Sequence, residues 1–190
     1  MRDTGLLGLR LTLGTYLAAH GAQKLFGALD GAGLEKTATT FHHIGLRPGR
    51  AMATLAGASE FAGGLLTAVG LADPVGPVAI VGAMTTAATV HGDKGPMSAK
   101  GGYELALTNL AAAAALAAAG PGRYSLDHLL RRRLPGPLVR LTLAGAAALT
   151  AYSVAGVVRT RRQRVATRAA VATSDQSEQS RQAADRRASA

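Results

Sequence analysis

Five apolar segments dominate this 190-residue chain, and each is about as long as a lipid bilayer is thick. A helix needs about 20 mostly apolar residues to cross the hydrocarbon core of a bilayer. The bilayer core holds no water, so a spanning chain has to satisfy its backbone polar groups within helices. The five segments cover residues 4–22, 51–72, 74–91, 103–120 and 137–158. The sequence therefore predicts an all-α, polytopic transmembrane protein.

The composition favours close helix packing in lipid. Hydrophobic residues make up 48% of the chain, but aromatic residues only 4%, and 24 residues are glycine. Small residues let helix backbones approach closely in a membrane, whereas a soluble core of this size normally buries more aromatic rings. The alternative, a soluble alanine-rich bundle, is disfavoured by the number of long, charge-poor segments. The chain has no cysteine, which excludes disulfides, thiolate nucleophiles and cysteine-ligated clusters.

The net charge of +10 points to lipid and not to nucleic acid, because many arginines lie in or beside the last apolar segment and in the tail. The first apolar run contains Arg10 and His20 and lacks a small-x-small cleavage site, so we expect it to be retained as a span. The region from Arg159 onward has too little apolar content to form a packed core. We expect residues 159–190 to be a disordered basic tail.

Turns separate the segments and set their orientation. Asp73-Pro74 joins the second and third segments so tightly that they must form an antiparallel hairpin. If all five segments span, the tail shares its side with Lys24, Lys36, Arg47, Arg50, Lys94 and Lys100. The positive-inside rule then places the tail in the cytoplasm, with Arg131, Arg132 and Arg133 on the unfavourable side. If the fifth segment lies along the surface instead, both termini can be cytoplasmic.

Six ionisable residues interrupt the apolar segments. Such groups cost roughly 2.5–3.5 kcal/mol each near the bilayer centre on insertion scales, so they need partners or water. They form our candidate intramembrane polar cluster: Arg10, His20, Lys24, Glu60, His91 and Glu104. The spacing of Arg10, His20 and Lys24 places them close to one face of a helix. We expect Glu60 to pair with one of these first-segment cations, and Glu104 with Lys24 or His91.

Small residues accompany this cluster. Gly14 and Gly21 flank the charged face of the first segment and would admit a neighbouring helix. In the second segment, Glu60 belongs to a stripe of small residues at helical spacing that also includes Ala53, Gly57 and Gly64.

The cluster allows two interpretations. The structural one is a set of buried ion pairs that fixes which helices are neighbours. The functional one is a proton path or a site for an anionic or quinone-like ligand, because ionisable groups within a membrane usually serve function. We expect no metal site, since the five histidines lack metal-binding spacing, and no nucleotide site, since no phosphate-binding loop motif occurs.

Six motifs resemble the DoxX family of bacterial membrane proteins: HGAQKLFG (20–27), GAGLE (31–35), IGLRPG (44–49), LAGASEFAGGLLTAVGL (55–71), GGYELAL (101–107) and GPGRYSLD (120–127). The resemblance implies a transmembrane four-helix bundle in the plasma membrane over residues 1–128. Residues 129–158 are then an extension with a fifth, C-terminal transmembrane helix, followed by the disordered basic tail. The family takes its name from a subunit of a thiosulfate:quinone oxidoreductase.

Three functions are open at this point. The resemblance favours a membrane subunit of a redox or oxidative-stress-related assembly, either non-catalytic or in contact with quinone, with a soluble redox partner or a second copy beside it. No cofactor is evident in the chain itself. In this interpretation the electron-transfer cofactors lie on a partner, and quinone is a candidate ligand. The alternatives are a scaffold that anchors a soluble partner through the basic tail and a small proton-coupled transporter.

Overall fold

The structure is a computed structural model that describes the backbone of residues 1–188 and the side chains of residues 1–176. The described residues form helices and no strand. The helices are α1 (Arg2–Phe26), α2 (Gly33–Ile44), α3 (Gly49–Val69), α4 (Val75–His91), α5 (Glu104–Ala119), α6 (Leu126–Leu129) and α7 (Gly136–Ala188). Two single 3₁₀ turns, Gly92–Lys94 and Ser98–Lys100, lie between α4 and α5. The all-α prediction is confirmed.

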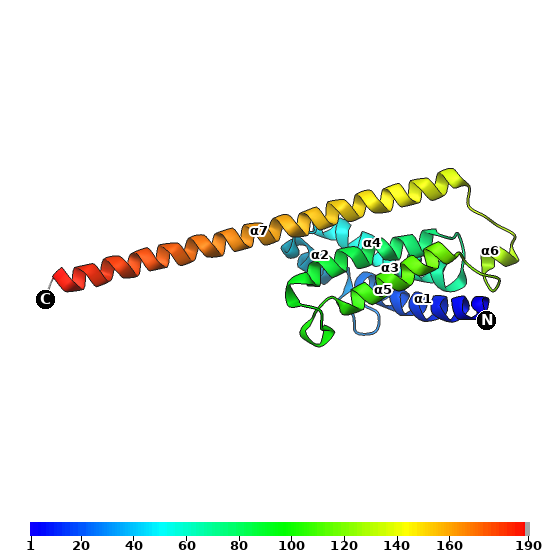
Figure 1. Cartoon of the computed structure of the whole chain (residues 1–190), viewed down its shortest axis with the longest axis horizontal. Helices are drawn as coiled ribbons and strands as arrows, with labels where there is room; N and C mark the ends of the chain where they lie inside the picture. Colours follow the sequence, from blue (N-terminus) through cyan, green and yellow to red (C-terminus); the bar gives the residue numbers. More distant parts are fainter. Residues whose placement is uncertain (189–190) are drawn as a thin grey trace.

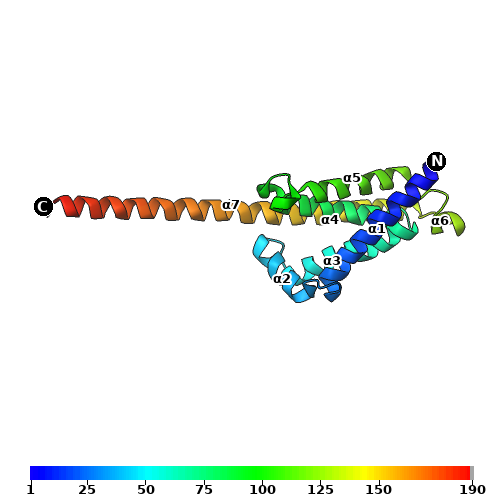
Figure 2. The ribbon, with the colours of Figure 1, turned by 90° about the horizontal axis from the view of Figure 1, so that it is seen from below.

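Helices α1, α3, α4 and α5 form the four-helix bundle. In this ring α1 packs on α3, α3 on α4 and α4 on α5, while α5 closes onto α1 (Figures 1 and 2). Its centre is a cluster of buried apolar side chains: Leu13, Leu17, Ile80, Met84, Ala113 and Leu116. The predicted hairpin is present, since α3 and α4 run antiparallel on either side of Asp73.

The outside of the bundle is apolar as well. Exposed leucines lie on α1, α5 and α7, among them Leu11, Leu105 and Leu141, as expected for helices that face lipid. Among the described residues, three stretches are long and apolar enough to cross a membrane: Gly49–Val69, Val75–Lys94 and Gly136–Gln176. Helix α5 is apolar but shorter, with 16 residues, and α1 is interrupted by its ionisable side chains. The chain is a polytopic all-α membrane protein.

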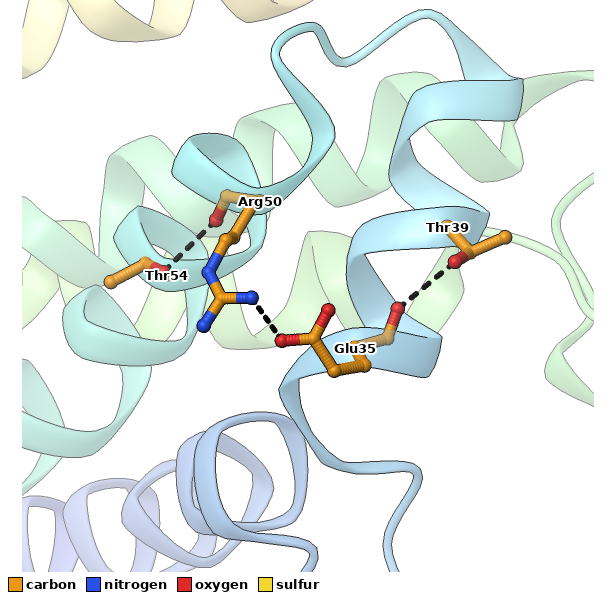
Figure 3. Close-up of polar contacts among 4 residues, drawn as sticks. All are labelled: Glu35, Thr39, Arg50 and Thr54. Atoms are coloured by element: carbon orange, nitrogen blue, oxygen red, sulfur yellow. Dashed lines mark hydrogen bonds and ion pairs between the residues drawn. The ribbon is translucent and has the colours of Figure 1, made fainter.

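Helix α2 was not predicted from the sequence. It packs against α3 and α1, beside the bundle (Figure 2). Figure 3 shows Arg50 of α3 donating to the carboxylate of Glu35 on α2. Each of these two residues also accepts a hydrogen bond at its backbone carbonyl, from Thr54 Oγ1 at 2.9 Å and from Thr39 Oγ1 at 3.0 Å. Helix α2 is amphipathic but has only 12 residues, so a search for apolar segments long enough to cross a bilayer passes over it.

Helix α7 lies along α4 and then continues far beyond the bundle (Figure 1). Its first part packs through Val157 against Leu46 and Met52, with Phe41, Ile44 and Val90 around them. Gly156 allows this close approach, because a Cβ there would lie 2.5 Å from the backbone oxygen of Gly45. The extension is therefore a packed part of the fold as far as Arg161, which donates to the carbonyl oxygen of Val90 at 2.8 Å and pairs with Asp93 at 3.0 Å.

The prediction of a disordered tail differs from the structure, in which α7 continues without a break through Arg159 to Ala188. The reason is local: no glycine or proline follows Gly156, and alanine, arginine and glutamine have high helix propensities. The expected lack of packing does hold for residues 162–176, whose side chains are all exposed. The last two residues of the predicted tail, 189–190, lie outside the described residues.

Candidate functional site

Helices α1 and α3 approach each other closely along their small residues. A Cβ added at Gly21 would lie 2.2 Å from the backbone nitrogen of Phe61, and one at Gly14 would lie 2.6 Å from the backbone oxygen of Gly64. Only glycine fits at such positions, where two helix backbones are almost in contact. The stripe predicted in the second segment therefore faces α1, and this contact brings Glu60 within reach of the first helix.

Glu60 forms an ion pair with Lys24, as predicted for a first-segment cation. The Glu60 side chain is only 6% exposed, whereas that of Lys24 is 28% exposed. Lys24 lies in the last turn of α1, so its ammonium extends from the end of that helix into the space beside α3. The pair thus has one deeply buried partner, the carboxylate, and one partner that still reaches the edge of the bundle.

A cavity of about 380 Å³ lies next to this pair. Helices α3, α4 and α7 form most of its wall, and Phe41 and Ile44 of α2 close one end. Most of the lining is apolar or small: Leu55, Ala56, Ala79, Gly82, Ala83, Ala87, Val90, Gly145, Ala146 and Leu149. The polar groups are the Lys24–Glu60 pair, His91 and several hydroxyls. The arrangement suits a largely apolar ligand with a small polar group.

Helix α7 supplies one wall of this cavity. Thr142, Gly145, Leu149 and Ser153 recur at helical spacing and face α3 and α4 across it. Gly145 leaves open space, since no heavy atom outside its own helix turn lies within 4 Å of a Cβ built there. The apolar extension predicted from residues 137–158 is therefore part of the site, which the sequence alone did not indicate.

The two histidines of the predicted cluster occupy different surroundings. His20 packs edge to face against Tyr16, with ring centroids 4.5 Å apart, and lies within electrostatic range of Lys24 and Glu60. His91 lines the far part of the cavity, where its Nδ1 is 2.8 Å from the carbonyl oxygen of Gly101. His20 therefore belongs with the ion pair, and His91 with the loop that follows α4.

The expected pairing of Glu104 is not formed. Its carboxylate accepts a hydrogen bond from the backbone nitrogen of Ser98 at 2.8 Å, at the start of a 3₁₀ turn, and His91 bonds to Gly101 instead. Both residues stabilise the connection between α4 and α5. Charge complementarity predicted a pair here because it could not anticipate that backbone groups of an 11-residue loop satisfy both side chains.

Arg10 lies near the opposite end of the bundle and is only 3% exposed. Its guanidinium donates to the carbonyl oxygens of Pro121 and Tyr124, the latter at 2.6 Å. Gly70 leaves space for this guanidinium, because a Cβ there would lie 2.5 Å from Arg10 Nη1. Its backbone is left-handed, with φ of 66°, which glycine adopts without strain. The six predicted residues thus form separate groups, and Arg10 fixes the segment after α5.

Two carboxylates near Arg10 were missed in the sequence. Asp127 is buried and accepts hydrogen bonds from the backbone nitrogens of Ala72 at 3.0 Å and Asp73 at 2.8 Å, which joins α6 to the α3–α4 hinge. Burial and the neighbouring Asp127 raise the pKa of the Asp73 carboxyl to about 6, and Arg10 opposes that rise. The capping pattern Ser-x-x-His at residues 125–128 was the available signal for this turn.

Comparison with known protein families gives one match. The family model described as DoxX matches residues 5–92, which run from the start of α1 to the end of α4. The motifs at residues 101–107 and 120–127 and the α7 wall of the cavity lie beyond this range. Searches of curated proteins and of solved structures found no match.

Proposed function

We propose, from the premise that this chain is a membrane protein carrying a DoxX domain, that it is a membrane subunit of a redox assembly and holds the head group of a quinone. One observation carries the proposal: a cavity of about 380 Å³ with apolar walls and a single ion pair, Lys24–Glu60, on its surface. Pockets for small molecules have this size and this mixture of apolar wall and few polar groups.

The chemistry of the lining fits a quinone. A quinone head group offers two carbonyl oxygens, which accept hydrogen bonds, and carries an apolar chain. The Lys24 ammonium has three donors and uses one on Glu60, so it can donate to a carbonyl oxygen while the carboxylate holds it in place. Reduction of a quinone takes up two electrons and two protons. The His91 imidazole lines the same cavity and is a further polar group on its wall.

The proposal includes the membrane and the orientation. We place the chain in the plasma membrane with its tail in the cytoplasm, because α7 leaves the bundle at the end where α2 and the loop after α4 lie. That end carries the basic residues Lys36, Arg47, Arg50, Lys94 and Lys100 as well as the arginines of the tail. A basic excess of this kind is typical of cytoplasmic flanks.

A second candidate function, the anchoring of a soluble partner, is favoured by α7 itself. This helix exposes all of its described side chains over residues 162–176, among them Arg162 and Arg168, while Arg164 donates to the carbonyl oxygen of His43 on α2 at 2.6 Å. A long basic helix projecting from a membrane protein is suited to bind an acidic surface. The two functions are compatible, because a redox subunit has to recruit the protein that supplies its electrons.

The quinone site is tested by adding a bulky side chain to the cavity lining, at a residue that has open space around it. In Gly145→Phe the ring is added at a residue of the cavity lining. In the control variant Gly8→Phe it is added at an exposed position of α1 outside the lining, where a Cβ also has nothing within 4 Å. Binding of decylubiquinone to the full chain in mild detergent is measured by equilibrium dialysis. We expect the wild type and Gly8→Phe to bind equally and Gly145→Phe to lose at least tenfold in affinity.

Two outcomes would overturn the proposal. One is the absence of decylubiquinone binding to the folded wild-type chain. The other is equal binding by Gly145→Phe, provided that its thermal unfolding matches that of Gly8→Phe, because the ligand would then lie elsewhere. A fall in affinity in both variants would show that bulk on any helix disturbs binding, which also contradicts a site in this cavity.

A further inference from the structure

A second, polar cavity lies at the opposite end of the bundle from the tail. It is open to the surface, has a volume of about 1040 Å³ and lies between the N-terminus, the α3–α4 hinge and the segment that links α5 to α7. We call it the arginine basin. Its lining residues are Arg2, Asp3, Asp73, Pro121, Gly122, Arg123, Asp127, His128, Arg131, Arg132, Arg133 and Leu134. Neither the proposed quinone site nor the DoxX match accounts for it, since most of these residues lie beyond residue 92.

The basin has an excess of unpaired positive charge. It contains five arginines and three aspartates. Asp3 accepts from the backbone nitrogen of Arg123, and Asp127 accepts from those of Ala72 and Asp73, so these two carboxylates are occupied by backbone groups. The three ion pairs of the described side chains all lie elsewhere. The guanidinium groups of Arg131, Arg132 and Arg133 therefore face the basin region without a protein counter-ion.

The segment that carries these arginines is held firmly. Arg10 donates to the carbonyl oxygens of Pro121 and Tyr124 from beneath, and Asp127 joins α6 to the hinge. Ser125 caps α6 by accepting from the backbone nitrogen of His128 at 3.2 Å. The backbone nitrogens of Arg131 and Arg132 bond to the carbonyl oxygens of His128 and Asp127, so the arginines extend from a fixed backbone. Binding then orders less of the chain than it would on a mobile tail.

Exposed leucines adjoin the arginines. Leu126, Leu129 and Leu130 are 36%, 74% and 53% exposed, directly before Arg131 in the chain. Leucines with this exposure are unfavourable in water but favourable in the acyl region of a bilayer, and they lie at the end of the bundle where the spanning helices end. Arginines beside them then reach the level of the phosphates. A soluble anion would use the arginines but would leave the leucines in water.

We propose that the arginine basin binds the phosphate of an anionic phospholipid, with Arg131, Arg132 and Arg133 on the phosphate and Leu129 and Leu130 in the acyl region. Guanidinium groups bind phosphate oxygens through paired hydrogen bonds, which makes arginine well suited to this role. The site also gives a reason for three arginines on the side that the positive-inside rule disfavours, since their charge is met by a bound lipid.

The test uses the full chain in mild detergent and measures bound lipid by native mass spectrometry. The wild type is titrated with phosphatidylglycerol, with phosphatidylcholine of the same chains and with inorganic phosphate. The basin variant is R131Q/R132Q/R133Q, and the control R159Q/R162Q/R168Q removes the same charge from α7. We expect a preference of at least tenfold for phosphatidylglycerol over phosphatidylcholine and a loss of about tenfold in the basin variant. The control should lose no more than about threefold, because its arginines attract anionic lipid only through their general charge.

A second variant, L129A/L130A, keeps all the arginines and separates lipid from soluble anion. We expect it to weaken phosphatidylglycerol binding severalfold. The proposal is overturned if the two arginine triples weaken binding equally, because the effect is then general charge. It is overturned as well if the wild type shows no preference between the two lipids, if inorganic phosphate competes at equal concentration, or if L129A/L130A binds phosphatidylglycerol like the wild type.

Discussion

Arg10 and Lys24 lie on the same helix and close to the same face, yet the protein satisfies them in different ways. Arg10 is almost completely buried and donates to two backbone carbonyl oxygens of the segment after α5. Lys24 is partly exposed and pairs with the carboxylate of Glu60 beside an apolar cavity. Arg10 fixes a connection between helices, and Lys24 leaves a charged group at the wall of the proposed ligand site.

The difference shows what each kind of partner can do. A guanidinium with five donors in a rigid fork can hold two carbonyls of a turn at once, which suits a structural role. An ammonium can rotate and keep two donors free for another acceptor, which suits a binding role. A cation within an apolar helix is therefore informative about function only when its partner is known.

The largest effect should come from stranding the Glu60 carboxylate. In Lys24→Met the carboxylate stays buried without a counter-charge, and we expect the free energy of unfolding to fall by about 3–5 kcal/mol. The measurement is unfolding in sodium dodecyl sulfate, followed by circular dichroism of the detergent-solubilised protein.

The double variant Lys24→Met/Glu60→Leu serves as the control for this prediction. It replaces the pair with apolar side chains and should recover most of the loss, because a well-packed apolar pair is often as stable as a buried ion pair. Glu60→Gln should be milder than Lys24→Met, since its amide oxygen still accepts a hydrogen bond from Lys24. A change of less than about 0.5 kcal/mol in Lys24→Met would mean that water reaches Glu60.

Removing Arg10 should cost less than removing Lys24. In Arg10→Met the carbonyl oxygens of Pro121 and Tyr124 lose their donor, and we expect a loss of about 2 kcal/mol in the free energy of unfolding. Tyr124 is exposed, so the turn can open to water and limit the cost. Limited proteolysis should show faster cleavage at residues 121–124 in Arg10→Met than in Lys24→Met. A larger loss for Arg10→Met than for Lys24→Met would reverse this ranking.

Much of the fold could be predicted because hydropathy and turn chemistry act locally. The apolar segment at residues 51–72 became α3 (Gly49–Val69), and the Asp73-Pro74 turn gave the antiparallel hairpin. Helix α2 and the helical tail could not be predicted in this way. Helix α2 depends on contacts with α3, which a short amphipathic segment does not reveal. The helical tail depends on the helix propensity of its residues, although it has no apolar face to pack.

The site could be predicted only where charges pair across helices. Glycine stripes and the need for a counter-charge led to Glu60 and a first-segment cation. The cavity depends on α7, whose position against α4 is a tertiary result. Arg10 and Glu104 have backbone partners in loops, and no sequence rule ranks a carbonyl or an amide of an unknown loop against a distant charged side chain. Asp73 and Asp127 were missed for the same reason.

Asp73 sharpens the comparison through pH, because it is the carboxylate next to Arg10. Its pKa is about 6 in the folded protein and 3.8 without the protein environment, so the folded state binds more protons between these values. Stability should therefore fall as the pH rises from about 4 to about 6 and stay level above that. In Asp73→Asn this part of the pH dependence should disappear, and stability at pH 7 should increase by on the order of 1 kcal/mol after allowance for partial exposure.

Thermal unfolding at pH 4, 5, 6 and 7 measures this effect, and Asp30→Asn provides a control that removes one carboxylate from an exposed turn. The control should retain the slope of the wild type. Equal slopes in all three proteins would show that Arg10 compensates Asp73 fully and that burial does not decide its titration.

The smallest effect should come from the ion pair between α2 and α3, which has the same chemistry as Lys24–Glu60 but lies at the surface. The side chains of Arg50 and Glu35 are 68% and 74% exposed, and such pairs contribute at most about 1 kcal/mol because water solvates both partners. Arg50→Ala removes the pair but keeps the hydrogen bond from Thr54, which is made to the backbone carbonyl of residue 50 (Figure 3). We expect Arg50→Ala to lower the free energy of unfolding by about 0.5 kcal/mol or less, and the difference to vanish in high salt, which screens exposed charges.

The loss in Lys24→Met should persist in the same salt, because the Glu60 carboxylate is buried. If high salt abolished the loss of unfolding free energy in both variants, the different exposure of the two ion pairs would not explain their different contributions to stability.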